Sequence, residues 1–567
     1  MVVATIVGIT LCFFFSFIIL LLVAAFADGS SGPVTKKSVL NLRLEGVVND
    51  RSTDNRLASI GLEDYSIGLD DVLLAIKAAK TDDMIQGIFL EPGAVSCGSA
   101  SLSEIRDALA DFRKSGKFVY AYSGAYTQGL YYLSSVADSV FLNPVGTVDW
   151  RGMAYQGIFY KRVLEKVGVE MQVVKVGTYK SFTEQYTNEK MSDANREQAS
   201  ALVNDFWKVV SDSVASSRKL SPSLLKAAAD SMLSFQPADS VLALKMVDKL
   251  AYRDEVLNSI RLRMGLDKGK KIPAVSPQDY VAGLVPVEEG GEVAVLYAVG
   301  EIDNGTIDGI NSDKVVKQIQ NLADDDKVKA VVFRVNSPGG SAYGSEQIWH
   351  ALQLLKKKKK LVVSMGDYAA SGGYYISCCA DAIVANPTTM TGSIGVFGVI
   401  PNVGPLADKI GVDYDVVKTS ESADFLSGLE SMTPVQQRRM QQYVGSCYSL
   451  FKKRCAEGRA MKEEEIENIA QGRVWSGVRA AQIGLVDQLG TLDDAVELAA
   501  KIAGLESYYT VDYPSKKNFF EELVDKTPSF GVRMFAPKQF ERERKAIEQA
   551  LKLERLQAAM PMTIRVE

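Results

Sequence analysis

Residues 361–377 read Leu-Val-Val-Ser-Met-Gly-Asp-Tyr-Ala-Ala-Ser-Gly-Gly-Tyr-Tyr-Ile-Ser, with Ser371 directly before the two glycines. The β-branched start predicts a buried strand, and the apolar run after the glycines predicts a helix. A serine hydroxyl at this junction is well placed for a nucleophile, because glycines admit a substrate closely and a helix N-terminus stabilises negative charge. The alternative is an ordinary strand–turn–helix corner whose serine caps the helix.

The same pattern occurs a second time, 243 residues upstream. Gly129-Leu-Tyr-Tyr-Leu-Ser134 matches Gly372-Gly-Tyr-Tyr-Ile-Ser377, and Asn143-Pro144 matches Asn386-Pro387 at the same offset of 243. Further pairs at this offset are Asp82-Asp83 with Asp325-Asp326 and Val173-Val-Lys175 with Val416-Val-Lys418. A constant offset over such a span indicates a tandem duplication. We therefore predict an N-terminal repeat at 38–289 and a C-terminal repeat at 290–505.

Each repeat alternates short apolar runs with amphipathic helical stretches. In the C-terminal repeat, the strand-like runs 293–297 and 328–335 alternate with the helical stretches 312–322 and 345–355. This alternation predicts an α/β fold in which the sheets are mainly parallel. The residues after the second repeat, 506–567, are rich in charge and are interpreted as a tail.

The N-terminus differs from the rest of the chain. Residues 2–27 are almost continuously apolar, which is long enough to cross a hydrocarbon core of about 30 Å. No basic residue precedes this run, unlike in a cleaved signal peptide, so we expect one transmembrane anchor followed by a linker at 28–37. A buried core helix is the alternative. The nearby charges, Lys36 and Lys37, follow the run and do not set its orientation.

Composition excludes several classes of protein. The net charge of −5 is too small to indicate a nucleic-acid partner. The six cysteines, among them the adjacent Cys378 and Cys379, lack metal-ligand spacing and are interpreted as buried free thiols. The single histidine, His350, excludes a multi-histidine zinc site, and a Ser–His–Asp triad could use only this residue. Its helical surroundings favour a plain helix position.

The two repeats differ in their polar residues. At the offset of 243, Ser371 aligns with Gln128, and Lys180 aligns with Ala423. One repeat has the hydroxyl and the other has the amine, which is expected if a single site is built from both. A lysine can replace histidine as general base when burial lowers its pKa, and apolar residues surround Lys180. The alternative is a solvated loop lysine.

A third feature is the turn Ser337-Pro-Gly-Gly-Ser341, which follows a predicted strand. Free backbone N–H groups at such a turn can form an oxyanion hole. The first repeat has Glu91-Pro-Gly-Ala94 here and lacks the double glycine. The C-terminal repeat is therefore predicted to hold the nucleophile and the oxyanion hole, and the N-terminal repeat the base.

Together these motifs resemble the signal peptide peptidase A family, also called protease IV, in its long duplicated form. The segments that carry the resemblance are Val335–Gly340, Ala369–Ser377, Ala385–Pro387, Thr391–Gly398 and Val176–Ser181. The resemblance implies a fold similar to the Clp protease and crotonase superfamily. It also implies a site in which no metal or cofactor takes part.

The resemblance assigns roles to individual residues. Ser371 would be the acylating nucleophile, Lys180 the general base, and Ser393 the residue that holds the lysine. The oxyanion hole would be formed by the backbone N–H groups of Gly372 and of Gly339 or Gly340.

The resemblance also implies a setting for the protein. Members of the family are single-pass proteins of the bacterial inner membrane, with the catalytic body on the periplasmic side. They assemble as homotetramers and degrade residual signal peptides. Two other functions stay open from the residues alone: an inactive membrane scaffold, and an acyl-thioester enzyme of crotonase type. The latter usually needs a carboxylate, which residues 368–377 lack. Cleavage specificity is not readable from spacing.

Overall fold

The computed structural model describes residues 36–52, 65–303, 309–516 and 557–559, together with the single residues Gly8, Ser16 and Val34. The predicted anchor at 2–27 lies outside the described residues apart from Gly8 and Ser16. In the part of the chain that is described, no helix combines the length and the hydropathy needed to cross a membrane.

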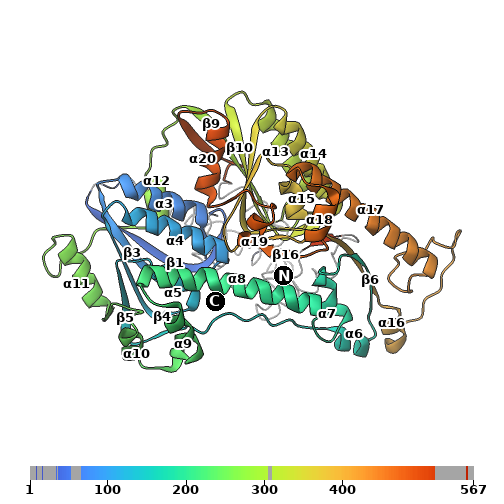
Figure 1. The fold of residues 1–567 in the computed structure, drawn as a ribbon, viewed down its shortest axis with the longest axis horizontal. Helices are drawn as coiled ribbons and strands as arrows, with labels where there is room; N and C mark the ends of the chain where they lie inside the picture. Colours follow the sequence, from blue (N-terminus) through green and yellow to red (C-terminus); the bar gives the residue numbers. More distant parts are fainter. Residues whose placement is uncertain are drawn as a thin grey trace.

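The N-terminal repeat is built on a sheet in which every strand pair is parallel (Figure 1). Its strand order is β2-β1-β3-β4-β5-β7, and β8 pairs with β1. The strands are β1 (Ser38–Asn49), β2 (Ser66–Gly68), β3 (Ile85–Ser96), β4 (Phe118–Tyr126), β5 (Ser139–Val148), β7 (Lys249–Leu250) and β8 (Ala274–Val275). The predicted α/β class with mainly parallel sheets is confirmed.

The C-terminal repeat has a second sheet with the order β16-β14-β12-β10-β9-β18. Its strands are β9 (Gly291–Val299), β10 (Val328–Ser337), β12 (Lys360–Ala370), β13 (Ala382–Ala385), β14 (Met390–Gly392), β16 (Val474–Ser476), β17 (Gln488–Leu489) and β18 (Tyr508–Tyr513). All pairs are parallel except β14 with β16. The carboxyl ends of β10 and β12 lead into the Pro-Gly-Gly turn and Ser371, so parallel pairing brings both segments to one edge of the sheet.

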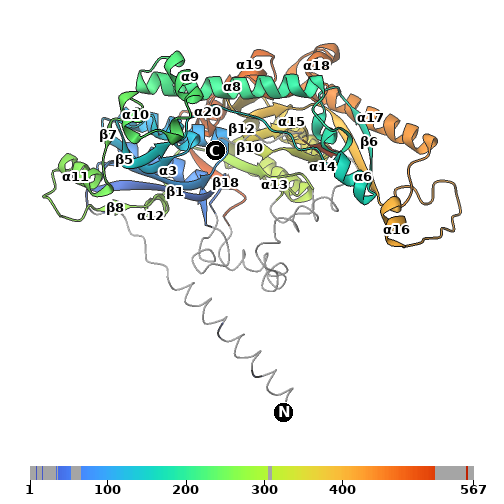
Figure 2. The ribbon, with the colours of Figure 1, turned by 90° about the horizontal axis from the view of Figure 1, so that it is seen from below.

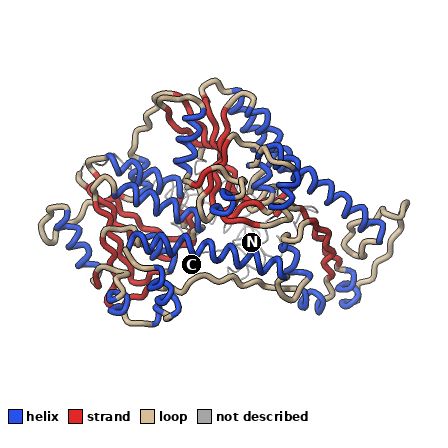
Figure 3. Tube along the Cα trace, in the orientation of Figure 1, coloured by secondary structure: helices blue, strands red, loops and turns tan. Residues whose placement is uncertain are grey.

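Helices cover both faces of each sheet, as Figure 3 shows by colour. In the N-terminal repeat they are α3 (Leu69–Thr81), α4 (Ser99–Arg113), α5 (Gln128–Ser134), α6 (Lys161–Val167), α7 (Glu184–Thr187), α8 (Asp193–Arg218), α9 (Pro222–Asp230), α10 (Ala238–Ala243), α11 (Arg253–Arg263) and α12 (Pro277–Ala282). In the C-terminal repeat they are α13 (Ser312–Asp324), α14 (Ala342–Lys356), α15 (Gly372–Ser377), α16 (Gly404–Ile410), α17 (Pro434–Arg459), α18 (Glu463–Ile469), α19 (Gly477–Gln482) and α20 (Leu492–Ile502). Each repeat therefore has its own buried apolar core, which defines two similar folding units.

The duplication seen in the sequence is present in the element bounds. Helices α3, α4 and α6 begin and end 243 residues before α13, α14 and α16, respectively. The long helices α8 and α17 correspond with a shift of two residues, because α17 begins 241 residues after α8. The two repeats are thus copies of one fold, and their differences are local.

A third, four-stranded sheet joins the repeats, with the order β11-β19-β15-β6, in which β11 is Gly339–Ser341 and β19 is Gln557–Ala559. Strand β6 (Glu170–Val176) belongs to the N-terminal repeat, and it pairs antiparallel with β15 (Val396–Asn402) of the C-terminal repeat. In Figures 1 and 2, β6 accordingly lies among the orange elements of the C-terminal repeat, beside α16 and α17. This pairing carries the residues that follow β6 into the C-terminal repeat.

The C-terminal boundary differs from the predicted one at 505. Residues Tyr508–Tyr513 form β18 at the edge of the second sheet, parallel to β9. Just beyond it, the Lys516 ammonium lies 2.9 Å from Asp70 and 2.7 Å from Asp71 of the N-terminal repeat. The C-terminal repeat thus extends past residue 505. The predicted boundary is too early, because the edge strand β18 lies in the stretch assigned to the charged tail. Much of that tail, 517–556 and 560–567, lies outside the described residues.

Candidate active site

Ser371 lies between β12 and α15, at the predicted junction. Its φ of 58° and ψ of −116° place it in a region that residues with a side chain rarely adopt. Its side chain makes no capping hydrogen bond, so the alternative of a helix-capping serine is wrong. The backbone turn instead directs the hydroxyl toward the N-terminal repeat, where it meets Lys180.

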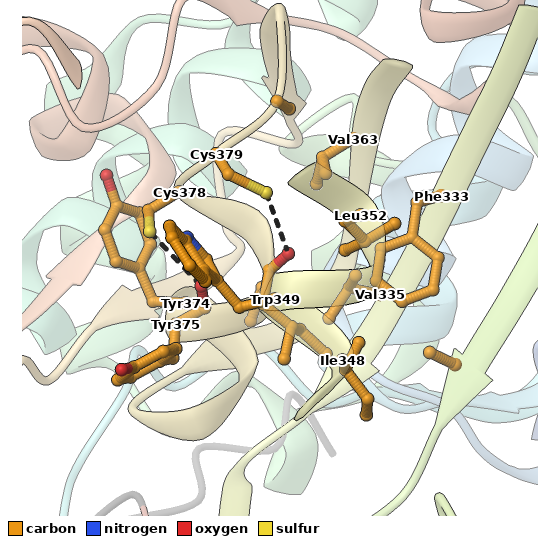
Figure 4. Close-up of a cluster of buried hydrophobic side chains, with 14 of the residues drawn as sticks. Phe333, Val335, Ile348, Trp349, Leu352, Val363, Tyr374, Tyr375, Cys378 and Cys379 are labelled. Atoms are coloured by element: carbon orange, nitrogen blue, oxygen red, sulfur yellow. Dashed lines mark hydrogen bonds between the residues drawn. The ribbon is translucent and has the colours of Figure 1, made fainter. Parts of the chain in front are cut away.

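The helix that follows Ser371 is held rigidly by the core. Figure 4 shows Tyr374, Tyr375, Cys378 and Cys379 packed among apolar side chains, with Trp349 beside them. Both thiols are buried and free, as predicted, and the Cys378 thiol donates to the Tyr375 carbonyl at 3.2 Å. Burial raises the pKa of the Cys378 thiol well above its ordinary value, so it stays protonated and unreactive. The helix therefore fixes the serine but adds no second nucleophile.

Lys180 comes from the other repeat and meets Ser371 directly. The Lys180 Nζ donates to the Ser371 Oγ at 2.8 Å, across 191 residues of sequence. It also lies 3.0 Å from the Ser393 Oγ and 3.0 Å from the Ser393 carbonyl oxygen. A charged amine has three hydrogens for these three acceptors. A neutral amine can keep both Ser393 bonds and turn its lone pair to the Ser371 hydroxyl.

The surroundings of Lys180 favour the neutral amine. Lys180 and Ser371 are both fully buried, at 0% exposure. Burial lowers the pKa of the Lys180 ammonium well below its ordinary value, because water no longer solvates the charge. The alternative of a solvated loop lysine is therefore wrong, and the amine has the properties of a general base.

Segments of both repeats hold the lysine in place. The loop after β6 is pinned to the C-terminal repeat by the Tyr179 N–H, which donates to the Gln471 carbonyl at 2.8 Å. Gln198 of α8 bridges the repeats, since its amide donates to the Tyr179 carbonyl at 3.0 Å and its oxygen accepts from the Val474 N–H at 3.2 Å. The β6–β15 ladder ends with Val176 opposite Val396, so the segments that carry Lys180 and Ser393 leave it at the same end.

Two glycines, Gly472 and Gly395, lie directly against the side chain of Lys180. A Cβ on Gly472, whose φ is +76°, would lie 2.6 Å from the Lys180 Cβ. A Cβ on Gly395 would lie 3.3 Å from the Lys180 Cδ. Neither glycine was among the predicted site residues. A lysine that must cross to another repeat needs small neighbours there, but nothing in the sequence shows which glycines lie beside it.

Gly472→Ala should lower kcat at least tenfold, because the new methyl group displaces the Lys180 stem from the line toward Ser371. The measurement is kcat and KM on a peptide ester. Gly504→Ala is the matched control, since Gly504 has a similar φ of +72° and nothing within 4 Å of its Cβ position. Both variants carry the same backbone strain, of roughly 1–2 kcal/mol. Equal activity of the two would show that the glycine at 472 is needed only for its backbone.

The predicted oxyanion glycines lie together. A Cβ on Gly372 would be 3.2 Å from the Gly340 nitrogen, so the start of α15 adjoins the Pro-Gly-Gly turn. The Gly339 N–H donates to the Ser337 Oγ at 3.2 Å and is occupied. The Gly339 carbonyl accepts from the Ile302 N–H, and the Ser341 N–H donates to the Ile302 carbonyl, both at 2.9 Å. The Gly340 N–H therefore points to the opposite side of β11 (Gly339–Ser341). Gly340 is the better placed partner, because its nitrogen lies next to Gly372 and its N–H points to the side of β11 on which Ala558 pairs.

An extended segment of the chain lies against this turn. Strand β19 (Gln557–Ala559) runs antiparallel to β11, with Ala558 opposite Gly340, and Gln557 lies opposite Phe397 of β15. The strip between β11 and β15 thus accepts a peptide backbone as an added strand. It borders the turn that adjoins Gly372 at the start of α15.

Other candidate groups lie outside the site. His350 lies in α14, as predicted, and its side chain is exposed, whereas Ser371 is fully buried. Within the described ranges, no group of three His, Cys, Asp or Glu side chains could hold a metal ion. At Ser371 the structure brings together two serine hydroxyls and one buried amine.

Two models of known protein families match the chain. The model described as "Peptidase family S49" matches residues 111–267 and 353–506, so it matches each repeat once. The model described as "Clp protease" matches residues 298–391, which include the Pro-Gly-Gly turn and Ser371. The first of these models covers more than half of the chain.

Three relatives illustrate the range of similar proteins. "Protease 4" of Salmonella typhi is 38% identical over 92% of this chain and 88% of its own length. "Serine protease SPPA, chloroplastic" of Arabidopsis thaliana is 30% identical over 83% of this chain and 70% of its own length. "Putative signal peptide peptidase SppA" of Enterococcus faecium is 32% identical over 40% of this chain and 66% of its own length.

Proposed function

Since this chain belongs to peptidase family S49 and is a serine protease, we propose that it degrades residual signal peptides with a Ser371–Lys180 dyad. The observation that carries the proposal is the 2.8 Å contact between the Lys180 Nζ and the Ser371 Oγ, two groups from different repeats. A hydroxyl beside a neutral, buried amine is an activated nucleophile. The same contact argues against an inactive scaffold.

The acylation step follows from this geometry. The Ser371 Oγ attacks the peptide carbonyl carbon while its proton passes to the Lys180 Nζ. The carbonyl oxygen becomes an oxyanion, which the N–H groups of Gly372 and Gly340 stabilise. Lys180 then protonates the leaving amine, the C–N bond breaks, and an acyl-enzyme ester on Ser371 remains.

Deacylation uses the same groups with water as the nucleophile. The neutral Lys180 amine takes a proton from water, and the hydroxide attacks the ester carbonyl. When the tetrahedral intermediate collapses, the lysine returns the proton to the Ser371 Oγ. Ser393 keeps the amine in line during both steps, through its two 3.0 Å contacts.

Two features support an extended apolar peptide as substrate. The strip between β11 and β15 pairs with β19 as a strand, and a substrate backbone can add in the same way. Apolar side chains flank the lysine: the centre of the Phe397 ring lies 5.8 Å from its Nζ, and Phe182 packs against Phe397. Cleaved signal peptides have apolar cores of this kind.

The setting of the protein belongs to the same proposal. The apolar run at 2–27 would anchor the chain once in the bacterial inner membrane, with the catalytic body on the periplasmic side. There the chain would assemble as a homotetramer. Support comes from the length of the apolar run and from the resemblance to protease IV, whose members have this arrangement.

The test is cleavage by purified full-length protein in detergent. A synthetic signal peptide, a hydrophilic peptide of equal length and an acyl-CoA thioester are incubated separately, and products are identified by mass spectrometry. We expect cleavage of the signal peptide, little cleavage of the hydrophilic peptide and no thioester turnover, with Ser371→Ala as the blank. Thioester turnover without peptide cleavage would overturn the proposal in favour of crotonase-type chemistry.

Activity should depend on pH through one ionisation. Only the neutral Lys180 amine can accept the serine proton, so kcat/KM should rise with pH and then level off. The midpoint should lie well below the ordinary lysine value of about 10.4, because burial lowers the Lys180 pKa. The measurement is kcat/KM from pH 5 to 10, with and without a chelator. A profile still rising at pH 10, or strong loss with chelator, would contradict base catalysis by this lysine.

A further inference from the structure

Strand β12 is irregular directly before Ser371. It pairs with β10 in regular register as far as Val335 and Met365, and the pairing resumes at Ser337 and Ala369. Over this step β12 contains two residues more than β10, so it forms a bulge. A bulge bends its strand and changes the direction in which the following residues point. Here the following residues lead to the proposed nucleophile.

Asn336 is the residue of β10 that lies opposite the bulge, which comprises residues 366–368. Its Oδ1 accepts from the Tyr368 N–H at 3.0 Å, and its Nδ2 donates to the Asp50 carboxylate. A Cβ on Gly366 would lie 3.0 Å from the Asn336 Cγ, so this glycine leaves room for the side chain. The Asn336 amide therefore holds the bulge where regular backbone pairing is interrupted.

The two neighbours of Asn336 require an amide between them. A carboxylate only accepts hydrogen bonds, and a backbone N–H only donates them. Asn336 offers its NH₂ group to Asp50 and its oxygen to Tyr368, which fixes the amide in one orientation. Asp50 is held in turn, since its other oxygen accepts from the Arg334 Nε at 3.2 Å. The bulge is thus fastened to the N-terminal repeat through a single amide.

The next residue of β10 contacts the chain on the other side of the nucleophile. A Cβ on Gly373 would lie 2.5 Å from the Ser337 carbonyl oxygen, and the Ser337 Oγ accepts from the Gly339 N–H at 3.2 Å. Asn336 and Ser337 therefore hold the segments before and after Ser371. The φ of Ser371 is 58°, a conformation that persists only where the surrounding structure fixes it.

The N-terminal repeat lacks this arrangement, as it lacks the nucleophile. At the offset of 243, Asn336 aligns with Gly93, and the bulge aligns with residues 123–125, Ser-Gly-Ala. The pairing of β3 with β4 ends at Leu90 and Ala121 and does not resume within the described residues. The amide and the resumed pairing thus occur in the repeat that supplies the hydroxyl, so they accompany the site rather than the shared fold.

We propose that Asn336 is a positioning residue for Ser371: by holding the bulge, it keeps the Ser371 hydroxyl in line with Lys180 and beside the Pro-Gly-Gly turn. The inference rests on the role of Ser371 in the proposed function. Loss of the Asn336 amide should slow acylation at saturating substrate, because a misplaced hydroxyl attacks less often. Substrate binding should change little, since Asn336 lies outside the strip between β11 and β15. The pH midpoint should stay in place, since Lys180 keeps its contacts.

The test exchanges the two partners of one hydrogen bond. Asn336→Asp removes the donor and sets a second carboxylate against Asp50. The double variant Asp50→Asn with Asn336→Asp restores one donor and one acceptor and keeps the total charge. Asn336→Ser removes the amide without adding a charge. For each variant, single-turnover acylation by a peptide p-nitrophenyl ester gives the rate at saturation and the half-saturating concentration, and urea unfolding gives the stability.

Asn402 offers a matched control. Its Nδ2 donates to the Glu170 carboxylate at 3.0 Å, and its Oδ1 accepts from the Gly404 N–H at 2.9 Å. This amide therefore also joins a carboxylate of the N-terminal repeat to a backbone N–H of the C-terminal repeat. It lies at the end of the β6–β15 ladder opposite to Val396. Asn402→Asp, alone and with Glu170→Gln, makes the same exchange away from Ser371.

Asn336→Asp and Asn336→Ser should each lower the saturated acylation rate at least tenfold, with the half-saturating concentration within twofold of wild type and the pH midpoint unchanged. The double variant with Asp50→Asn should recover to within threefold of wild type, and Asn402→Asp should keep the wild-type rate. Should Asn336→Asp fail to fold, Asn336→Ser and the double variant decide the matter.

Three results would overturn the inference: wild-type rates in the Asn336 variants, an equal loss of rate in Asn402→Asp, or no recovery in the double variant. The ester separates these results from a failure of the proposed function. A wild-type protein that is acylated by the ester but cleaves no signal peptide would overturn the proposed function alone. A wild-type protein that is not acylated at Ser371 would overturn both.

Discussion

Replacing Lys180 with methionine should reduce peptide hydrolysis by about 10⁴-fold or more in kcat, which is the size of effect expected when one member of a catalytic unit is removed. A methionine side chain can fill the buried space that the Lys180 side chain occupies, but it has no amine. Without the amine, no other group that contacts Ser371 in the described site can accept its proton. The measurement is single-turnover cleavage of a signal peptide, with Ser371→Ala in parallel.

The double variant of Lys180 and Ser371 should be no slower than either single variant. The serine is not a nucleophile without the base, and the base has no task without the serine, so the two losses do not add. Each single variant should retain peptide binding, because neither change touches the β11–β15 strip. A Lys180→Met protein with near-wild-type kcat would rule out the dyad.

Stability provides the control for folding. Since burial lowers the Lys180 pKa, the unfolded chain binds more protons than the native state between the native pKa and about 10.4. Stability therefore rises with pH across that window in the wild-type protein, and the lysine is destabilising at pH 7. Lys180→Met should raise the unfolding midpoint at pH 7 and lose this advantage near pH 10. An inactive variant of raised stability cannot owe its inactivity to misfolding.

The fold and the pairing of Ser371 with Lys180 could be predicted from the sequence because the chain contains two copies of one unit. These two repeats can be aligned with each other. The offset that relates Gly129 to Gly372 predicts where elements recur, and α3 and α13 recur at that offset. The complementary loss of Ser371 and Lys180 between the repeats predicted that they meet, and the structure brings them to 2.8 Å. These inferences needed only comparison of residues at fixed spacing.

Contacts between repeats could not be predicted in this way, because no local pattern encodes them. The N-terminus of α4 has no capping side chain of its own and receives the Asp367 carboxylate from the other repeat, at 2.7 Å from the Ala100 N–H. A Cβ on Gly98 would lie 2.0 Å from that carboxyl carbon, so the glycine admits the partner. The sequence shows a glycine before a helix; only tertiary structure shows what fills the space.

The second large effect is expected from Arg334, a buried charge between the repeats. Its guanidinium lies 3.2 Å from the Asp50 carboxylate and 2.8 Å from the Glu104 carboxylate, both in the N-terminal repeat. The side chains are at most 4% exposed. The Ser364 Oγ accepts a further bond from Arg334 at 3.0 Å. This cluster couples β10, and with it β12 and Ser371, to the repeat that carries Lys180.

Arg334→Met should destabilise the protein by about 3–5 kcal/mol, because it leaves two buried carboxylates without a counter-charge. The measurement is urea unfolding at pH 8. Arg43→Met is the matched control, since Arg43 pairs with Glu45 on the surface and should cost less than about 1 kcal/mol. Activity of Arg334→Met should also fall, because the two repeats no longer hold Lys180 and Ser371 in register.

The pH dependence of this loss distinguishes charge from packing. Burial raises the pKa of the Glu104 carboxyl to about 7, more than the Arg334 guanidinium lowers it. A carboxyl whose pKa is raised on folding binds its proton more tightly in the native state, so its contribution to stability falls as pH rises from about 4.5 through 7. Without Arg334 that pKa rises further, and the destabilisation should be larger at pH 8 than at pH 5. Adding Glu104→Gln to Arg334→Met should recover part of the loss at pH 8. An equal loss at both pH values, with no recovery, would show that Arg334 acts through packing alone.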